Sequence, residues 1–264
     1  MNILLVGCGN IGTALLHAWL DNEALQKIIV VQPSLSKAAD FKKENVVTFV
    51  ASLQEVSADF KPDLVVLAIK PQKIDHVAPE LSRFFGHALL VSLLTGVSIK
   101  RLAAGVPNAT HIIRVMPNVA LKVAQSVNLT YANQQVSDRE KEQITLAFNS
   151  SGKMHWLPRE ELIDILTPIS GSGPAYFFLL AEILVQITID LGIEETVARD
   201  LIQQTFIGSA QLTNENHHFQ SLVKAVTSKG GTTEAALNVL QPAFSDLMQQ
   251  AINAALVRVK ELAS

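Results

Sequence analysis

Cysteine is nearly absent from this sequence of 264 residues, which contains a single one, Cys8. One thiol excludes an intramolecular disulfide, and no cluster of cysteine and histidine has the spacing of a zinc site, so we expect no metal ion. An excess of positive charge is also missing, because the formal net charge is −3. This value excludes the broad basic surface typical of nucleic-acid binding, so any bound anion must be held by a local arrangement of groups.

Long uninterrupted hydrophobic runs are missing as well. Residues 1–6 are too few to span a membrane, and no positively charged segment precedes them as in a signal peptide. The longest later run, 175–189, is interrupted by Glu182 and Gln186, and we expect it to fall short of a membrane span. These absences predict a protein with no membrane partner, located in the cytoplasm.

The first half of the chain alternates short apolar runs with helical segments. We expect strands at 2–6, 28–31, 64–69, 89–93 and 112–116, separated by helical segments at 12–25, 35–44, 73–85 and 99–104. The runs are rich in branched residues and almost continuously apolar, as in strands that helices cover on both faces. A strand near 125–132, a helix near 137–150 and a strand near 153–157 are expected to complete the sheet. This order predicts an α/β fold with a doubly wound parallel sheet.

After about Pro158 the pattern becomes purely helical. Helices are expected near 174–191, 194–213, 217–227, 232–239 and 242–263. The first of these is apolar around its whole circumference, which is typical of a helix buried within a protein or between subunits. We therefore expect two domains, 1–157 with the sheet and 158–264 with helices alone, and self-association through the second.

A glycine-rich loop follows the first strand directly and opens the first helix. It comprises Gly7, Cys8, Gly9, Asn10, Ile11 and Gly12. In this position G-x-G-x-x-G is typical of a dinucleotide site: the first glycine makes a tight turn, the second admits the pyrophosphate, and the third lets helix and strand pack closely. The helix N-terminus adds a partial positive charge. The loop predicts a Rossmann-type nucleotide domain, and the alternative is a glycine-rich turn without a ligand.

The end of the second strand indicates which dinucleotide is used. NAD enzymes usually place Asp or Glu there, to accept a hydrogen bond from the ribose 2′-hydroxyl. This strand ends instead in Gln32 and Pro33, followed by Ser34, Ser36 and Lys37. Two hydroxyls and an ammonium favour a 2′-phosphate, so we predict NADP as the cofactor, with NADPH preferred and NADH as a second donor. The alternative is a solvated Lys37 and poor selectivity.

Four further segments go beyond a general nucleotide fold: 68–72 (AIKPQ), 114–118 (RVMPN), 170–176 (SGSGPAY) and 226–233 (VTSKGGTT). Together with the glycine loop they resemble the signature blocks of the pyrroline-5-carboxylate reductase family, and they span nearly the whole chain. The resemblance implies a dinucleotide domain followed by an all-helical dimerisation domain, and reduction of a small molecule, 1-pyrroline-5-carboxylate, to L-proline. A protonated cyclic imine accepts hydride directly, so this chemistry needs no catalytic histidine or cysteine.

The same resemblance implies roles for individual residues. The residues expected at the substrate are Ser228, Gly230, Gly231, Thr232, Thr233 and Glu160. Among them the hydroxyl of Thr233 would bond the imine nitrogen, as the catalytic group, while the backbone of 230–232 would hold the carboxylate. Position in the sheet, independently of the resemblance, indicates the residues at the cofactor, because α/β sheets bind ligands where their strands end. These residues are Ala68, Ile69, Lys70, Pro71, Thr95 and Asn118. The alternatives are a solvated strand end for Lys70, a loop-shaping role for Asn118 and a simple helix cap for the glycine pair.

The sequence departs from the family pattern at Leu94, Ala120 and Ala225, and we expect Leu94 to give the cofactor site a bulkier lining. These departures leave two alternatives open. One is a reductase of a related imine or of a 2-hydroxy acid, which would carry a lysine or aspartate near 170–176 as proton donor, and none is present there. The other is a nucleotide-binding regulatory protein that has lost catalysis.

Overall fold

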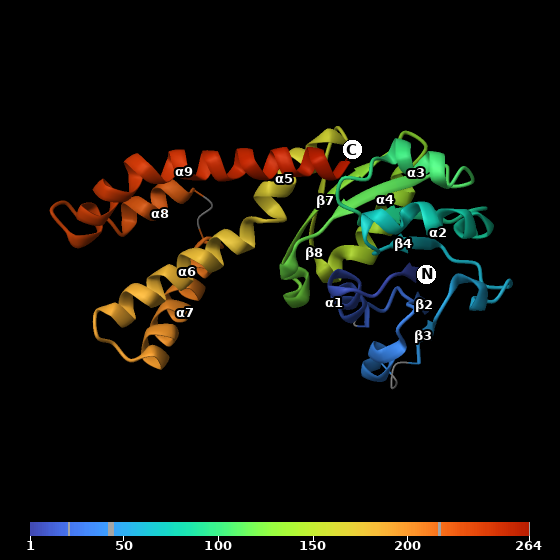
Figure 1. Ribbon diagram of the computed structural model, residues 1–264, viewed down its shortest axis with the longest axis horizontal. Coiled ribbons are helices and arrows are strands. Elements are labelled where there is room, and N and C mark those ends of the chain that lie inside the picture. The colour runs from blue at the N-terminus through green and yellow to red at the C-terminus, as the bar shows by residue number, and fades with distance from the viewer. Residues whose placement is uncertain (21, 42–44, 216–217, 264) are drawn as a thin grey trace. The chain divides into compact units, whose positions relative to one another are not determined.

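The computed structural model describes residues 1–20, 22–41, 45–215 and 218–263, and Figure 1 labels its elements. These residues divide into two compact units, Met1–Ser172 with Leu256–Ser264, and Gly173–Ala255. We expected the division after residue 157, so the first unit keeps a stretch of chain that the sequence had assigned to the second.

The first unit contains one eight-stranded sheet, in the order β3-β2-β1-β4-β5-β6-β7-β8 (Figure 1). Its strands are β1 (Asn2–Val6), β2 (Lys27–Val31), β3 (Val47–Val50), β4 (Leu64–Leu67), β5 (Leu89–Ser92), β6 (Ile112–Met116), β7 (Ser126–Ala132) and β8 (Gly152–Trp156). All neighbouring strands are parallel except β6 and β7. The predicted doubly wound sheet is therefore confirmed.

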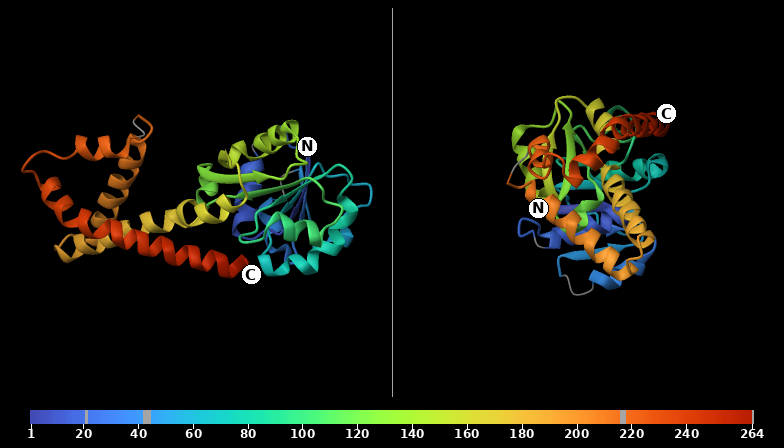
Figure 2. Two further views of the ribbon diagram at one scale, coloured as in Figure 1. Left: turned by 90° about the horizontal axis from the view of Figure 1, so that it is seen from above. Right: turned by 90° about the vertical axis from the view of Figure 1, so that its left-hand side faces the viewer.

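Helices cover both faces of this sheet (Figure 2). They are α1 (Asn10–Leu20), α2 (Ile74–Leu81), α3 (Ile99–Gly105), α4 (Asp138–Phe148) and α5 (Glu161–Ser170). Because side chains alternate along a strand, Ile3 and Leu5 of β1 pack in the cluster with α1 and α4, whereas Leu4 and Val6 pack in the cluster with α2 and α3. Both faces of the sheet are thereby buried, which accounts for the nearly continuous apolar runs of the strands.

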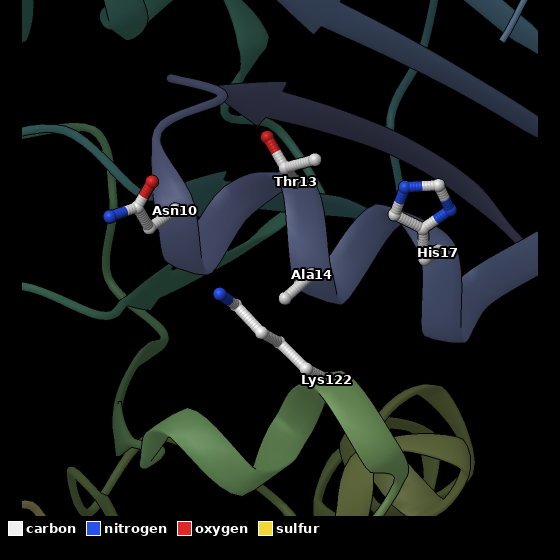
Figure 3. A pocket seen from close by; sticks show the side chains of 5 residues that line it. All are labelled: Asn10, Thr13, Ala14, His17 and Lys122. Atoms are coloured by element: carbon white, nitrogen blue, oxygen red, sulfur yellow. The ribbon is translucent and has the colours of Figure 1, made fainter. Parts of the chain in front are cut away.

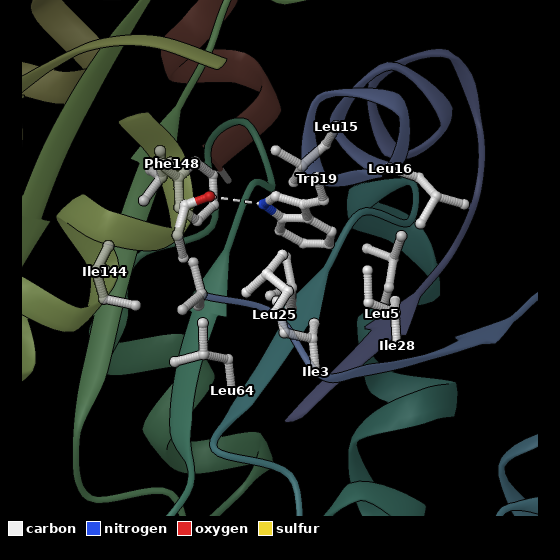
Figure 4. Packing of buried hydrophobic residues seen from close by; sticks show 14 of the residues in the cluster. Ile3, Leu5, Leu15, Leu16, Trp19, Leu25, Ile28, Leu64, Ile144 and Phe148 are labelled. Carbon is white, nitrogen blue, oxygen red and sulfur yellow. Dashed lines mark hydrogen bonds between the residues drawn. The ribbon is translucent and has the colours of Figure 1, made fainter. Parts of the chain in front are cut away.

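Trp19 of α1 occupies the centre of the first cluster (Figure 4). Its indole is 1% exposed, and its Nε1 donates a hydrogen bond of 2.7 Å to the carbonyl of Ala147 in α4. A buried indole N–H needs such a partner, so this bond both satisfies the ring and ties α1 to α4. The bond therefore fixes the last turn of α1 against α4.

Three features of the first unit differ from the expected ones. The strand β3 was missed, because its residues are only partly buried and the run of apolar residues is short. The segment 35–44 was expected to be helical, and the described part of it forms a 3-10 helix, η1 (Leu35–Phe41). The strand β7 runs antiparallel to β6 because only a short 3-10 connection, η5 (Val119–Val123), joins them, whereas a parallel pair needs a long crossover.

The second unit is helical, as expected. It contains α6 (Gly173–Asp190), α7 (Glu195–Leu212), α8 (Phe219–Ala225) and most of α9 (Thr232–Ala263). Two helices were expected where α9 runs continuously through Pro242. Proline removes one backbone hydrogen bond from a helix interior but does not always end the helix, so the predicted break at residues 240–241 is wrong.

The helix α6 leaves most of its apolar side chains exposed. Phe177, Phe178 and Leu179 are 58%, 58% and 62% exposed, respectively. The stretch Glu161–Asp190 is long and apolar enough to cross a membrane by length and composition, which is weak support for a span. The expectation that this region is too short and too interrupted for a span was therefore wrong on those two criteria.

Candidate functional site

The glycine loop has the geometry that each of its glycines was expected to serve. Gly7 has φ +97°, and a Cβ there would lie 2.7 Å from the carbonyl oxygen of Ala68. A Cβ on Gly12 would lie 2.5 Å from the carbonyl oxygen of Gly7, so helix and strand pack in contact. Gly9, by contrast, is exposed and would place its Cβ in open space. The loop thus leaves room for a ligand at Gly9 alone, as a pyrophosphate requires.

The side chain of Gln32, the residue that follows β2, is hydrogen-bonded to the backbone of this loop. Its Oε1 accepts a hydrogen bond of 2.9 Å from the backbone N–H of Cys8. The thiol of Cys8 is 1% exposed and lies 3.3 Å from the hydroxyl of Thr13, so Cys8 faces the protein interior. The sequence did not single out Gln32 as part of the site, although a polar residue ending an apolar strand was a usable signal.

Hydroxyl groups follow the end of β2. Ser34 and Ser36 are exposed, and their Oγ atoms lie 3.1 Å apart. Lys37 belongs to η1, and its side chain lies outside the described residues. Asn10 and Ile11 start α1, and no acidic residue occupies the first turn of that helix. The edge of the sheet expected to hold the dinucleotide therefore carries hydroxyls and helix N–H groups, without a carboxylate at β2.

The ends of β4 and β5 reach the same edge. Ala68 and Ile69 contact Gly7, while Lys70 is exposed and Pro71 starts a 3-10 helix, η3 (Pro71–Lys73). Thr95 is half-buried, and its hydroxyl lies 3.7 Å from the sulfur of Met116 on β6. A role in cofactor binding stays a prediction for all of these residues.

The Met-Pro-Asn segment meets the Ser-Gly-Ser segment, although about fifty positions separate them in the sequence. The Nδ2 of Asn118 donates a hydrogen bond of 2.9 Å to the carbonyl of Ser170, and its Oδ1 accepts one of 3.0 Å from the N–H of Ala120. A Cβ on Gly171 would lie 3.7 Å from Met116. The amide of Asn118 therefore shapes its loop, which was the alternative role, and contact with the nicotinamide stays a prediction.

A buried arginine anchors α5 to the sheet. Arg114 on β6 is 2% exposed, and its guanidinium donates to Glu160 at 2.9 Å and to Asp164 at 2.8 Å. The same Oε1 of Glu160 accepts a 2.7 Å hydrogen bond from the N–H of Ile99, the first residue of α3. Glu160 was expected at the rim of the substrate site, but these bonds give it a structural role. A charged residue inside the apolar run IIRVM must be paired when buried, which was the signal for this network.

The turn that precedes α9 has a defined hydrogen-bond pattern. Gly230 has φ +74°, and its N–H donates a 2.7 Å hydrogen bond to Glu234. The N–H of Gly231 donates to the carbonyl of Ser228 at 3.0 Å. The first helical bond runs from Ala235 to Gly231. The N–H groups of both glycines are thus engaged within the turn. The N–H groups of residues 232–234 come next along the chain and lie ahead of the first helical hydrogen bond.

The side chains of this turn differ in accessibility. Thr233 is half-buried, whereas Ser228 and Thr232 are exposed. A Cβ on Gly231 would lie 2.4 Å from the Oγ of Ser228, so this position admits only glycine unless Ser228 moves. The expected substrate residues therefore lie together in one turn, with the exception of Glu160, which belongs to the first unit.

The departures from the family pattern have little effect on the cofactor edge. Leu94 is 3% exposed and belongs to the hydrophobic cluster of the α2 and α3 face, so it does not line an open site as expected. Ala120 receives the cap of Asn118 in η5, and Ala225 is exposed at the end of α8. Among the described residues, no group of three or more His, Cys, Asp or Glu could hold a metal ion, and the expectation of no metal stays a prediction.

A hollow of about 340 Å³ lies beside α1 (Figure 3). It is lined by Asn10, Thr13, Ala14 and His17 of α1, together with Lys122 of η5. The side chain of Lys122 extends from η5 toward the first turns of α1 (Figure 3). Sequence analysis gave no indication of this lysine, because only the fold brings η5 next to α1.

Two family models match the chain. The model described as pyrroline-5-carboxylate reductase dimerisation matches residues 160–262. The model described as NADP oxidoreductase, coenzyme F420-dependent, matches residues 2–96. The two matches follow the order of the sheet and the helices along the chain.

Curated relatives and solved structures match over nearly the full length. The pyrroline-5-carboxylate reductase of Haemophilus influenzae is 35% identical, with 98% of this chain and 97% of the relative covered. That of Pseudomonas aeruginosa is 34% identical, with 99% and 96% covered. The structure of the Coxiella burnetii enzyme has a TM-score of 0.89 at 32% identity, covering 100% of this chain and 98% of its own. A Plasmodium falciparum pyrroline carboxylate reductase, solved with NADP bound, has a TM-score of 0.85 at 27% identity, with 100% and 98% covered.

Proposed function

Because the chain belongs to the pyrroline-5-carboxylate reductase family, we propose that it reduces 1-pyrroline-5-carboxylate to L-proline by hydride transfer from NADPH. The observation that carries this proposal is the match to curated relatives over 98% of the chain. The glycine loop with open space at Gly9 supports the cofactor part, and the Gly230–Gly231 turn supports the substrate part.

The cofactor, when bound, supplies the hydride, and the residues of the sheet edge bind and orient it. The backbone at Gly9 leaves room for the pyrophosphate, and the first turn of α1 offers N–H groups and the positive end of the helix dipole. Lys70 and Thr95 are proposed to contact the ribose and nicotinamide portions. The preference for NADPH over NADH rests on the exposed Ser34 and Ser36 beyond β2, where no carboxylate would repel a 2′-phosphate.

The turn before α9 is proposed to hold the substrate. The N–H groups of Thr232, Thr233 and Glu234 lie ahead of the first helical hydrogen bond, so they are the donors that suit the substrate carboxylate. This assignment replaces the donors expected at Gly230 and Gly231, whose N–H groups are engaged. The hydroxyl of Thr233 bonds the imine nitrogen, which keeps the electrophilic carbon oriented toward the hydride.

We further propose that the helical region 158–264 forms a dimer and that the enzyme works in the cytoplasm. The name of the family model supports dimerisation of residues 160–262. The boundary at residue 157 is proposed as the functional one, since that model begins within a few residues of it.

One assay tests the function directly. The purified protein is mixed with NADPH and racemic 1-pyrroline-5-carboxylate, and absorbance of the reduced nicotinamide is followed while proline is measured at the end. We expect NADPH consumption and proline in equal amounts, with about half of the racemate converted, and a higher kcat/KM with NADPH than with NADH. Turnover of a 2-hydroxy acid's keto partner instead, or cofactor binding without turnover, would contradict the proposal and favour one of the two alternatives.

A further inference from the structure

The hollow beside α1 is lined by a lysine, Lys122, that has no role in the proposed function. Its α1 residues recur at intervals of three and four, so they form one stripe along the helix, from Asn10 to His17. This stripe is about 10 Å long at the rise of an α-helix. Its upper end is Asn10, in the first turn, next to the exposed Gly9. The hollow is therefore continuous with the loop proposed to bind the pyrophosphate.

Two positive groups converge at this upper end. One is the N-terminus of α1, which carries a partial positive charge and has no acidic residue in its first turn. The other is the ammonium of Lys122, which extends toward the same turns (Figure 3). No aspartate or glutamate is among the residues that line the hollow, and no hydrogen bond or ion pair engages Lys122 within the described part of the chain. Without a bound anion, the ammonium of Lys122 and the positive end of the α1 dipole repel each other.

One backbone N–H group of the glycine loop is not available to a phosphate. Gln32 already accepts the N–H of Cys8. Further donors are those of the first turn of α1, and both Asn10 of that turn and Lys122 line the hollow. A dianionic pyrophosphate seated there would separate the two positive groups and bind both.

We propose that Lys122 is a cofactor-binding residue, whose ammonium contacts the pyrophosphate of the dinucleotide across the upper end of this hollow. The inference rests on the proposed dinucleotide function and adds a side-chain contact to it. Since NADPH and NADH share the pyrophosphate, Lys122 strengthens the binding of both and does not discriminate between them. Discrimination is left to Ser34 and Ser36 beyond β2.

The test is cofactor binding, measured without substrate. Titrations of NADPH and of NADH, followed by nicotinamide fluorescence, compare wild type with Lys122→Gln at low and at high salt. We expect the variant to bind both cofactors about five- to tenfold more weakly at low salt. This loss lies between the contribution of a screened ion pair and that of a charge-assisted hydrogen bond. The loss should shrink at high salt because the lost contact is electrostatic. ADP, which carries the same diphosphate, should compete less well against NADPH in the variant.

The matched control is Lys100→Gln. Lys100 is an exposed lysine of α3, on the other face of the sheet, so the variant has the same net charge without touching the hollow. It should bind both cofactors as wild type does. A second variant, Lys122→Arg, keeps the charge and should retain most of the affinity.

The outcomes separate this inference from the function on which it rests. A wild type that binds neither cofactor would overturn the proposed function itself. A wild type that binds, with Lys122→Gln equal to it for both cofactors, would overturn the role of Lys122 alone. A loss confined to NADPH would also overturn it, because the lysine would then contact the 2′-phosphate. Thermal unfolding without ligand checks that Lys122→Gln folds, and removal of the like charge should leave its Tm at or above that of wild type.

Discussion

Single glycines decide whether the nucleotide loop folds and whether it binds. Gly9→Ala and Gly12→Ala add the same methyl group at the third and sixth positions after Val6, the last residue of β1. We expect Gly9→Ala to fold normally, since the added Cβ meets open space, and to bind NADPH much more weakly, since it enters the pyrophosphate position. Fluorescence titration measures the affinity, and circular dichroism checks the fold.

Gly12→Ala is the contrasting variant. Its Cβ would lie 2.5 Å from the carbonyl oxygen of Gly7, which is backbone and has no flexible end to move aside. We expect this variant to lose stability, by about 1–3 kcal/mol as for other overpacked positions, measured by urea unfolding. Equal NADPH affinity of Gly9→Ala and wild type would show that the open space at Gly9 is not the cofactor site.

A third residue-scale prediction concerns the hydroxyl of Thr233. Thr233→Val keeps the shape and removes the proposed bond to the imine nitrogen. A hydrogen bond to a charged group is worth about 1.5–3 kcal/mol, and each 1.36 kcal/mol is about tenfold in rate, so kcat/KM should fall about 10- to 150-fold. Thr232→Val is the control, because Thr232 is exposed, and it should keep most activity while losing at most about 1 kcal/mol of stability. Activity of Thr233→Val within about twofold of wild type would remove Thr233 from the mechanism.

The residue Ala124, at the end of η5, adopts a left-handed conformation with φ +58°. A residue with a Cβ is disfavoured there by about 1–2 kcal/mol. Ala124→Gly should therefore raise the free energy of unfolding by about 1 kcal/mol, since relief of the strain outweighs the added freedom of the unfolded chain. Urea unfolding checks the sign, and a lower stability would mean that packing of the Ala124 methyl group outweighs its strain.

Among elements, the buried strands were predictable and their surroundings less so. The strands β1, β4 and β5 are fully or almost fully buried, and continuous branched apolar runs signal such strands directly. The edge strand β3 has no fully buried residue, so its pattern is indistinct. No helix was predicted at 161–170, where the structure has α5. Pro168 lies inside this helix, and a proline within a pattern is usually a signal that a helix ends.

For the candidate site, the sequence indicated the positions where the backbone conformation requires a glycine. Gly7, Gly12 and Gly230 have special geometry that local motifs report. It did not indicate contacts that the tertiary fold makes between different elements, such as Gln32 with Cys8 or Lys122 beside α1. Local motifs carry backbone geometry, whereas side-chain partnership across elements depends on packing.

The network of Arg114 gives a prediction at the scale of elements, since it joins β6, α5 and the start of α3. Arg114→Met removes the cation and leaves two carboxylates side by side. We expect the free energy of unfolding to fall by about 3 kcal/mol, the lower end of the cost of breaking a buried pair, because Glu160 and Asp164 keep some contact with water. Urea unfolding measures the loss, and Arg114→Lys, which keeps the charge but not the forked geometry, should lose less. A change below about 1 kcal/mol for Arg114→Met would show that the network contributes little to the fold.

At the scale of the whole molecule, the exposed apolar helices require a partner surface. The side chains of α6 and α7 pack against each other, with the rings of Phe177 and Phe206 6.2 Å apart, yet many apolar residues of both helices stay exposed. Soluble monomers rarely expose contiguous apolar surfaces of this kind. Self-association through residues 160–262, as the family model's name indicates, would bury them, whereas a membrane is the alternative that the length and composition of Glu161–Asp190 leave open.

Sedimentation velocity without detergent distinguishes these cases. We expect a dimer or larger assembly at micromolar concentration, because each Å² of apolar surface buried contributes about 25 cal/mol to association. Leu179→Glu places a charge on α6 at a side chain that is 62% exposed in the single chain, and burying that charge without a partner is costly, so the assembly should dissociate toward monomer. The matched control is Leu146→Glu on α4 of the first unit, where a leucine is 52% exposed, and this variant should sediment as wild type does. A wild-type monomer at micromolar concentration, or a protein that stays in solution only with detergent, would contradict dimerisation through the helical unit.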